Sequence, residues 1–137
     1  MGVRAKAREC AMQMLFQSEM SPQDPKKLET QFWKSAKGSD TTREFANALF
    51  EGAAKDIAGL DELIARNTVQ ANWKMERIAA IDRAILRLGI HELRHGETPA
   101  RVVINESVEL AKKFSSEDAS GFVNAVLDSV RKSLITK

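Results

Sequence analysis

The sequence predicts an all-α fold in which three N-terminal helices pack on three or four C-terminal ones. Apolar residues recur with a period near 3.6 along most of the chain, which is the pattern of helices with one buried face. No segment alternates with period two long enough to form a strand. The three prolines lie where the periodic segments begin, a position that suits the first turn of a helix.

The first two predicted helices are separated by a short spacer. The first runs from Val3 to about Met20, and Ser21 and Pro22 end it. The second begins at Pro25 and ends at Gly38. The apolar residues of each fall within one arc of a helical wheel: Ala7, Cys10, Ala11, Met14 and Leu15 in the first, and Leu28, Phe32, Trp33 and Ala36 in the second.

The middle of the chain predicts one long amphipathic helix and one buried helix. Thr41 followed by Glu44 has the spacing of a capping box, and the periodicity then continues to about Asn67. After a polar connection from residue 68 to 72, the segment 78–93 is apolar over so wide an arc that it must be largely buried. We expect this segment to be the central helix.

Two further helices complete the prediction. Thr98 and Pro99 have the order of an N-cap and first-turn pair, and Ser115 with Asp118 repeats the capping-box spacing. The predicted inward residues are Val103, Ile104, Val108, Ala111 and Phe114 in the first of these helices and Phe122, Val123, Val126, Leu127 and Val130 in the second.

Composition excludes several classes of protein. The chain has 137 residues, 43% hydrophobic and 29% charged, with a formal net charge of +2, so disorder is not indicated. No apolar run reaches the roughly 18 residues of a membrane span, and the N-terminal residues lack the apolar stretch typical of a signal peptide, so we expect no membrane association and a cytoplasmic location. Cys10 is the only cysteine, which excludes an internal disulfide and favours a core position.

The sequence offers little for catalysis. Glycine-rich phosphate-binding loops and a GxSxG nucleophile motif are absent. His91 and His95 are four residues apart, but no HExxH frame or third ligand cluster accompanies them. We therefore expect no catalytic residue, no metal site and no cofactor, and we predict that the protein is not an enzyme.

Two aspartates lie among apolar neighbours, where an unpaired carboxylate would be costly. Asp56 is expected to pair with a nearby base, and Asp82 to cap a helix that begins at Arg83. The alternative for Asp82 is that it accepts a hydrogen bond from a ligand.

Basic residues form two candidate binding faces. Arg4, Lys6 and Arg8 have no acid among them, and Arg8, Met12 and Phe16 line a stripe outside the predicted core face. Such a face suits nucleic acid, because cations neutralise phosphates and rings stack on unpaired bases. The alternative is that Met12 and Phe16 pack on other helices and the cations are solvated.

A second basic stripe is predicted on the central helix. It comprises Arg83, Arg87, His91 and Arg94, on the side opposite Ile78 and Ile85. It is either a surface for phosphates or a surface whose charges are compensated by Glu92 and Glu97. Spacing alone leaves both interpretations open.

Several motifs, in order along nearly the whole chain, resemble the NusB family of transcription antitermination factors. They are Arg4-x-Lys6-x-Arg8-Glu9-Cys10-Ala11 with Met14-Leu15-Phe16-Gln17, then Asn72-Trp73, Arg77-Ile78 and the run from Ile81 to Gly89, then the runs 103–112 and 122–128. Where the family often has a further arginine this chain has Ala5, and one fewer arginine should reduce affinity for phosphate by about one contact.

The resemblance implies two small helical bundles set side by side, with about seven helices. It divides the single domain 1–137 into an N-terminal subdomain, 1–70, and a C-terminal subdomain, 71–137. It also implies a role in binding single-stranded boxA RNA of nascent ribosomal RNA transcripts together with NusE, a ribosomal protein of the small subunit. In the family this complex helps the RNA polymerase elongation complex to read through terminators.

The resemblance also assigns residues to two surfaces. Six match the family's RNA-contacting surface: Arg4, Lys6, Arg8, Asp82, Arg87 and Phe122. Three match its NusE-facing surface: Phe16, Glu76 and Asp118. In this picture the first helix and the stripe through Arg87 are two walls of one RNA groove, and Phe122 is either a core residue or a ring that stacks on a base.

Two alternative functions remain. One is an RNA-binding accessory domain like those fused to ribosomal RNA methyltransferases. The other is a helical bundle that mediates protein contacts only, as a homodimer through Met12 and Phe16 or with another partner.

Overall fold

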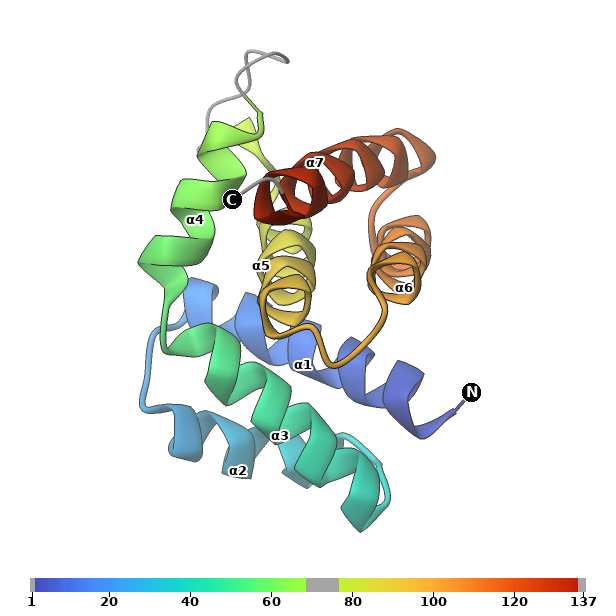
Figure 1. The fold of residues 1–137 in the computed structure, drawn as a ribbon. Coiled ribbons are helices and arrows are strands. Elements are labelled where there is room, and N and C mark those ends of the chain that lie inside the picture. Colours follow the sequence, from blue (N-terminus) through green and yellow to red (C-terminus); the bar gives the residue numbers. More distant parts are fainter. Residues whose placement is uncertain (1, 69–76, 136–137) are drawn as a thin grey trace.

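Seven α-helices build the fold, and the part of the chain described by a computed structural model, residues 2–68 and 77–135, contains no strand. The helices are α1 (Val3–Met20), α2 (Pro25–Ser35), α3 (Asp40–Ala54), α4 (Ile57–Arg66), α5 (Ala80–His95), α6 (Ala100–Phe114) and α7 (Glu117–Ile135) (Figure 1). The all-α prediction and the expectation of about seven helices are confirmed.

The first two helices begin where the sequence predicts. α1 spans Val3–Met20, and the amide of Ser21 closes its last turn on the Gln17 carbonyl. α2 has Pro25 in its first turn, and the Asp24 carboxylate caps it by accepting a hydrogen bond from the Lys27 amide. α2 ends at Ser35, three residues before Gly38.

The predicted long helix after Thr41 is wrong, because the chain breaks at Lys55 and Asp56 into α3 and α4. The cap of α3 is the Ser39 hydroxyl, which accepts from the Thr42 amide, so Thr41 lies inside the helix. The Asp56 carboxylate caps α4 by accepting from the Gly59 amide. A Cβ atom at Gly59 would lie 2.2 Å from that carboxylate, so the tight cap requires glycine there.

The C-terminal helices begin close to the predicted positions, but their predicted caps are wrong. α5 starts at Ala80, so Asp82 lies in its first turn and does not cap it. Pro99 is the N-cap residue of α6, without a side-chain bond, and the Thr98 hydroxyl accepts from Arg8 instead. The Ser116 hydroxyl, not that of Ser115, accepts from the Ala119 amide at the start of α7.

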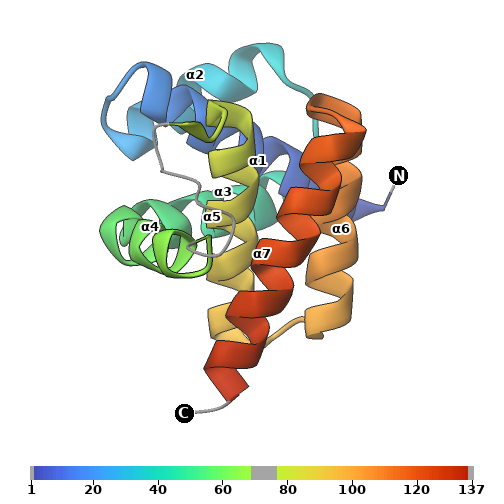
Figure 2. The same cartoon turned by 90° about the horizontal axis from the view of Figure 1, so that it is seen from above.

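A single hydrophobic cluster joins residues from both halves of the chain, including Cys10 of α1 and Leu127 of α7. α5 lies at the centre, with α1 and α3 on one side and α6 and α7 on another (Figures 1 and 2). Gly89 lets α6 and α7 approach it, because an added Cβ would lie 3.0 Å from Ser107 and Leu127 side-chain atoms. The proposed subdomain boundary at residues 70 and 71 falls outside the described residues and stays a prediction.

Candidate nucleic-acid interface

The three cations at the start of α1 point to three different places. The Arg4 guanidinium lies over the Phe45 ring of α3, 4.9 Å from its centroid. The Lys6 ammonium lies 3.5 Å from a Glu9 carboxylate oxygen, and its side chain is 40% exposed. Arg8 is buried. Arg4 and Lys6 are therefore the two members of this group that solvent or a phosphate reaches directly.

Arg8 forms a buried ion pair with Glu92 of α5. Its Nε donates to Oε1 at 2.8 Å and its Nη2 to Oε2 at 3.0 Å, with a further bond of 3.5 Å to the Thr98 hydroxyl. Both side chains are 8% exposed. A bidentate pair of this kind fixes the guanidinium in one orientation, so Arg8 ties α1 to α5.

Arg87 is also buried, but near the other end of α1. Its guanidinium binds both Asp61 carboxylate oxygens at 2.8 Å and Glu19 at 3.0 Å. Arg83 donates to both Glu19 oxygens, at 2.8 and 2.7 Å, and this hydrogen bonding lowers the pKa of the Glu19 carboxyl. The structure thus does not bring Arg8 and Arg87 together as two walls of one groove.

The predicted solvated stripe on the central helix is therefore corrected. Arg87 and His91 are buried, and Glu92, expected to compensate the arginines of its own helix, is bound to Arg8 of α1 instead. The acids that pair with these arginines come from other helices, because α5 is surrounded by them: Glu19 from α1, Asp61 from α4, and Asp56, which pairs with Arg94 at 3.0 Å. The prediction that Asp56 pairs with a base is confirmed.

Of the two interpretations of the stripe on α1, the one in which Met12 and Phe16 pack on other helices is confirmed. Met12 has no exposed surface and belongs to the core, while Phe16 is half-buried and packs against that core. The helix is covered on several sides, so a residue outside its most apolar arc is still enclosed. Met12 therefore cannot take part in a homodimer contact.

Of the remaining predicted residues, Asp82 lies in the first turn of α5, and Phe122 and Asp118 lie on α7. Asp82 is buried, its Oδ1 atom has no hydrogen-bond partner, and burial raises the pKa of its carboxyl, while a hydrogen bond with Ser115 acts in the opposite direction. Phe122 is half-buried against the core and Asp118 is exposed in the first turn of α7. Glu76 lies outside the described residues.

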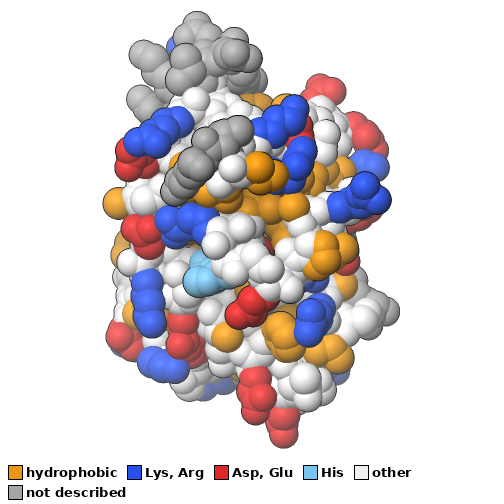
Figure 3. Space-filling model, viewed as in Figure 1, with side chains coloured by type: hydrophobic (Ala, Val, Ile, Leu, Met, Phe, Trp, Pro, Cys, Tyr) orange, Lys and Arg blue, Asp and Glu red, His pale blue; other side chains and the backbone are white. Residues whose placement is uncertain are grey.

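Acidic side chains are mixed with the basic ones over the surface. On the face drawn in Figure 3, Lys and Arg side chains alternate with Asp and Glu and form no single stripe. Near the predicted RNA surface, the Lys113 ammonium binds Glu9 at 2.8 Å. Glu9 thus lies between Lys6 and Lys113.

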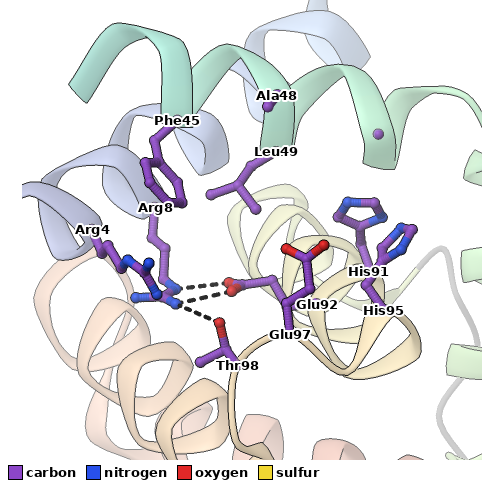
Figure 4. A pocket seen from close by; sticks show the side chains of 11 residues that line it. Arg4, Arg8, Phe45, Ala48, Leu49, His91, Glu92, His95, Glu97 and Thr98 are labelled. Carbon is purple, nitrogen blue, oxygen red and sulfur yellow. Dashed lines mark hydrogen bonds and ion pairs between the residues drawn. The ribbon is translucent and has the colours of Figure 1, made fainter. Parts of the chain in front are cut away.

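A pocket of about 340 Å³ that the sequence did not reveal lies between α1, α3 and α5. Figure 4 shows the Arg4 and Phe45 side chains at one end, His91 and His95 at the other, and the Arg8–Glu92 pair between them. His91 is 7% exposed and its Nδ1 atom has no hydrogen-bond partner. Burial, with smaller contributions from His95 and Arg94, lowers the pKa of His91 to about 4.

Gly52 makes room for the His91 ring. A Cβ atom at position 52 would lie 2.5 Å from two atoms of the imidazole. Sequence spacing could not reveal this contact, because Gly52 and His91 lie on different helices and only the packing of α3 on α5 brings them together.

Metal binding has no support within residues 2–68 and 77–135, where no group of three His, Cys, Asp or Glu side chains is arranged to hold an ion. His91 and His95 contact each other edge to face, with ring centroids 4.3 Å apart. None of the described helices combines the length and apolar character that crossing a membrane requires.

Comparison with known proteins supplies the family. Residues 5–132 match the model of the NusB family, which is most of the chain. The chain belongs to the NusB family. Among its relatives are two proteins named transcription antitermination protein NusB. The one from Sorangium cellulosum is 40% identical over 98% of this chain and 95% of its own, and the one from Koribacter versatilis is 44% identical over 97% and 91%.

A solved structure of the NusB family shares the arrangement of helices. It is a crystal structure of the antitermination factors NusB and NusE in complex with double-stranded RNA. The matched chain is 29% identical, covers 97% of this chain and 98% of its own, and superposes with a TM-score of 0.84. The resemblance read from the sequence motifs is thereby confirmed at the level of family and fold.

Proposed function

We propose that this chain is a transcription antitermination factor that binds boxA RNA of nascent ribosomal RNA transcripts together with NusE and helps the RNA polymerase elongation complex to pass terminators. The observation that carries the proposal is the likeness over almost the full length to proteins named for antitermination, joined with the fold shared with a NusB chain crystallised with NusE and RNA. The role is one of binding and not of catalysis. Acting on nascent transcripts, the protein works in the bacterial cytoplasm.

On the RNA side, the six predicted residues divide by exposure. Arg4 and Lys6 are accessible and suit direct contact with phosphates. Arg8 and Arg87 are buried in ion pairs, so their contribution is to hold α1 against α5 in the orientation that presents the accessible cations. Asp82 is buried to the same degree, but unlike the two arginines it has a carboxylate oxygen without a partner, which suits a base amine or imino group, and Phe122 offers a partly exposed ring.

On the protein side, Phe16 and Asp118 are the described members of the proposed NusE surface. Phe16 is half-buried, and Asp118 is exposed at the start of α7. A partly exposed aromatic side chain and an exposed carboxylate are typical components of a protein interface, since aromatic residues supply contact area and charges supply orientation.

Gel-shift titration tests the proposal. The chain is titrated against boxA RNA and against an unrelated single-stranded RNA of equal length, each with and without NusE. We expect NusE to tighten binding to boxA RNA and to leave binding to the unrelated RNA weak. Equally poor binding of both RNAs in all conditions would instead support the protein-contact function.

A variant at Asp118 tests the partner surface separately. Asp118→Lys is expected to lower the affinity for NusE by reversing an exposed charge, and to leave the circular-dichroism melt unchanged because the residue is exposed. Asp40→Lys, at an exposed acid in the first turn of α3, is the matched control, since it reverses a charge near another helix start. A collapsed melt for Asp118→Lys alone would show that the residue acts in helix capping.

A further inference from the structure

The pocket between α1, α3 and α5 is separate from the Asp82 and Phe122 region of the proposed RNA surface, yet it adjoins that surface through Arg4. Its lining combines the apolar side chains of Ala48 and Leu49 on α3 with polar groups from α1, α5 and the connection to α6. A volume of about 340 Å³ is within the range of small-molecule sites. An apolar wall with a few converging polar groups is the usual composition of such sites.

The charges in the pocket favour a neutral guest. Two arginines, Arg4 and Arg8, are matched by two glutamates, Glu92 and Glu97. Arg8 and Glu92 are moreover bound to each other, so neither is available as a free charge. A phosphate placed inside would meet both carboxylates, whereas a neutral group with donors and acceptors along its edge meets complementary partners.

The mouth of the pocket offers a flat, stacking surface. The Arg4 guanidinium covers the exposed Phe45 ring and is itself exposed (Figure 4). Unpaired bases stack on guanidinium planes as well as on aromatic rings. A base entering beside Arg4 would extend this stack, and the same guanidinium would lie close to the phosphate attached to that nucleotide.

The far end of the pocket contains an unsatisfied polar group. The Nδ1 atom of His91 is buried without a hydrogen-bond partner, although most buried polar atoms in proteins are satisfied. Figure 4 places His91 at the opposite end from Arg4, with the Glu97 side chain between them. The edge of a nucleobase carries hydrogen-bond donors and acceptors, so it can supply the partner that the Nδ1 atom of His91 lacks.

From these observations we propose that the pocket receives one unpaired base of the bound RNA, stacked beside Arg4 with its polar edge toward Glu97 and His91. This inference rests on the proposed function and extends it, because it assigns a base-recognition site to a face built by α3. Phosphate contacts at Arg4 and Lys6 give affinity without sequence preference, and a base held in a pocket supplies that preference.

The test combines a filled pocket with RNA that lacks single bases. Ala48 is exposed at the pocket wall, so Ala48→Phe fills the space and removes no charge or hydrogen bond. Ala65→Phe on α4 is the matched control, since Ala65 is also exposed and lies outside the pocket lining. Both proteins, in complex with NusE, are titrated with boxA RNA and with a series in which each nucleotide in turn is abasic.

We expect one abasic position to weaken binding of the unsubstituted protein by about tenfold, the usual effect of losing one stacked base. Ala48→Phe should weaken binding to intact RNA by a similar factor and should no longer respond to that abasic position, while Ala65→Phe behaves like the unsubstituted protein. Melting temperatures of both variants equal to that of the unsubstituted protein establish that folding is unaffected.

Three results overturn the inference. Unchanged RNA binding by Ala48→Phe overturns it while leaving the proposed function intact, as does a weakened variant that keeps every abasic penalty. A loss of NusE affinity in Ala48→Phe without RNA also overturns it, because the pocket would then belong to a protein contact. If the unsubstituted complex itself fails to prefer boxA RNA, the proposed function fails first.

Discussion

The two ends of α1 are bound to α5 by ion pairs of opposite polarity. At the N-terminal end, α1 supplies the cation, Arg8, and α5 the acid, Glu92. At the C-terminal end, α1 supplies the acid, Glu19, and α5 the cations, Arg83 and Arg87. Since residue 8 meets residue 92 while residue 19 meets residues 83 and 87, the two helices run in opposite directions where they touch.

The difference lies in what remains accessible at each end. At the C-terminal end, Arg83 and Arg87 are 16% and 9% exposed in their side chains, and Glu19 and Asp61 bind them. At the N-terminal end, Arg4 is exposed and Lys6 is 40% exposed. Each end of α1 has two arginines beside it, so the number of arginines does not distinguish the two ends. Accessible positive charge is found at the N-terminal end, on Arg4 and Lys6.

Arg8→Ala is expected to have the largest effect on stability. It leaves the Glu92 carboxylate, 8% exposed, without its cation, and removing one partner of a buried pair costs about 3 to 5 kcal/mol. Urea unfolding measures the loss. Arg8→Met combined with Glu92→Leu removes both charges and should recover most of the stability, since apolar replacements of a buried pair are often tolerated.

The same pair of variants separates two roles of Arg8. If the double variant is stable and still binds boxA RNA with NusE, Arg8 acts by holding α1 in place. If it is stable and binds weakly, the guanidinium itself contacts RNA. An Arg8→Ala protein as stable as the unsubstituted chain would contradict the buried-pair argument.

Arg87→Ala should destabilise the protein less, by about 2 kcal/mol, because its partners are better solvated than Glu92. Asp61 and Glu19 are 28% and 22% exposed, and Glu19 keeps Arg83. The measurement is the same urea titration. A loss larger than that of Arg8→Ala would reverse the predicted order of the two ends.

His91 makes the N-terminal end sensitive to acid. Burial lowers the pKa of His91 to about 4, whereas an unfolded histidine titrates near about 6.5. The unfolded state therefore takes up a proton first as pH falls, and the free energy of unfolding should decrease between about pH 6.5 and 4, by about 2 to 3 kcal/mol. His91→Phe keeps a ring beside Gly52 and should remove this slope.

Another buried group, Glu29, also makes the stability depend on pH and has to be separated from His91. Burial and the neighbouring Glu51 carboxyl raise the pKa of Glu29 to about 7, so its contribution has the opposite sign and stability falls as pH rises from about 4.5 through 7. Comparing the unsubstituted protein with His91→Phe at each pH cancels the Glu29 contribution. Parallel curves for the two proteins would show that His91 does not carry the acid sensitivity.

The sequence predicted the helices well because periodicity and breakers are local signals. α1 and α2 begin at the predicted residues, and the buried central segment became α5. The break between α3 and α4 was missed because apolar periodicity continues across it. There the local hydrogen bond of the Asp56 carboxylate, with glycine three residues later, prevails over periodicity.

Exposure was predicted less well, because a wheel describes one helix and burial depends on every helix around it. Met12, Arg87 and His91 were placed outside the core by their spacing and are buried by packing between helices distant in sequence. The acids Glu19 and Asp61 could not be matched to Arg87 from spacing, since they are 68 and 26 residues away. The family motifs indicated the surface, but not which of its cations are accessible.

The smallest expected change in stability, and the sharpest test of the contrast, comes from Lys6→Ala. Lys113 remains paired with Glu9 at 2.8 Å, and a partly exposed ion pair contributes about 0 to 1 kcal/mol, so the melt should move little. Affinity for boxA RNA should nevertheless fall, and the slope of log affinity against log salt should decrease in magnitude by about 0.7, the value for one phosphate contact on a single strand.

Lys27→Ala, which removes an exposed lysine from α2, is the matched control and should leave the slope unchanged. Equal slopes for both variants would mean that Lys6, although accessible, contacts no phosphate, and that the N-terminal end differs from the C-terminal end in exposure only.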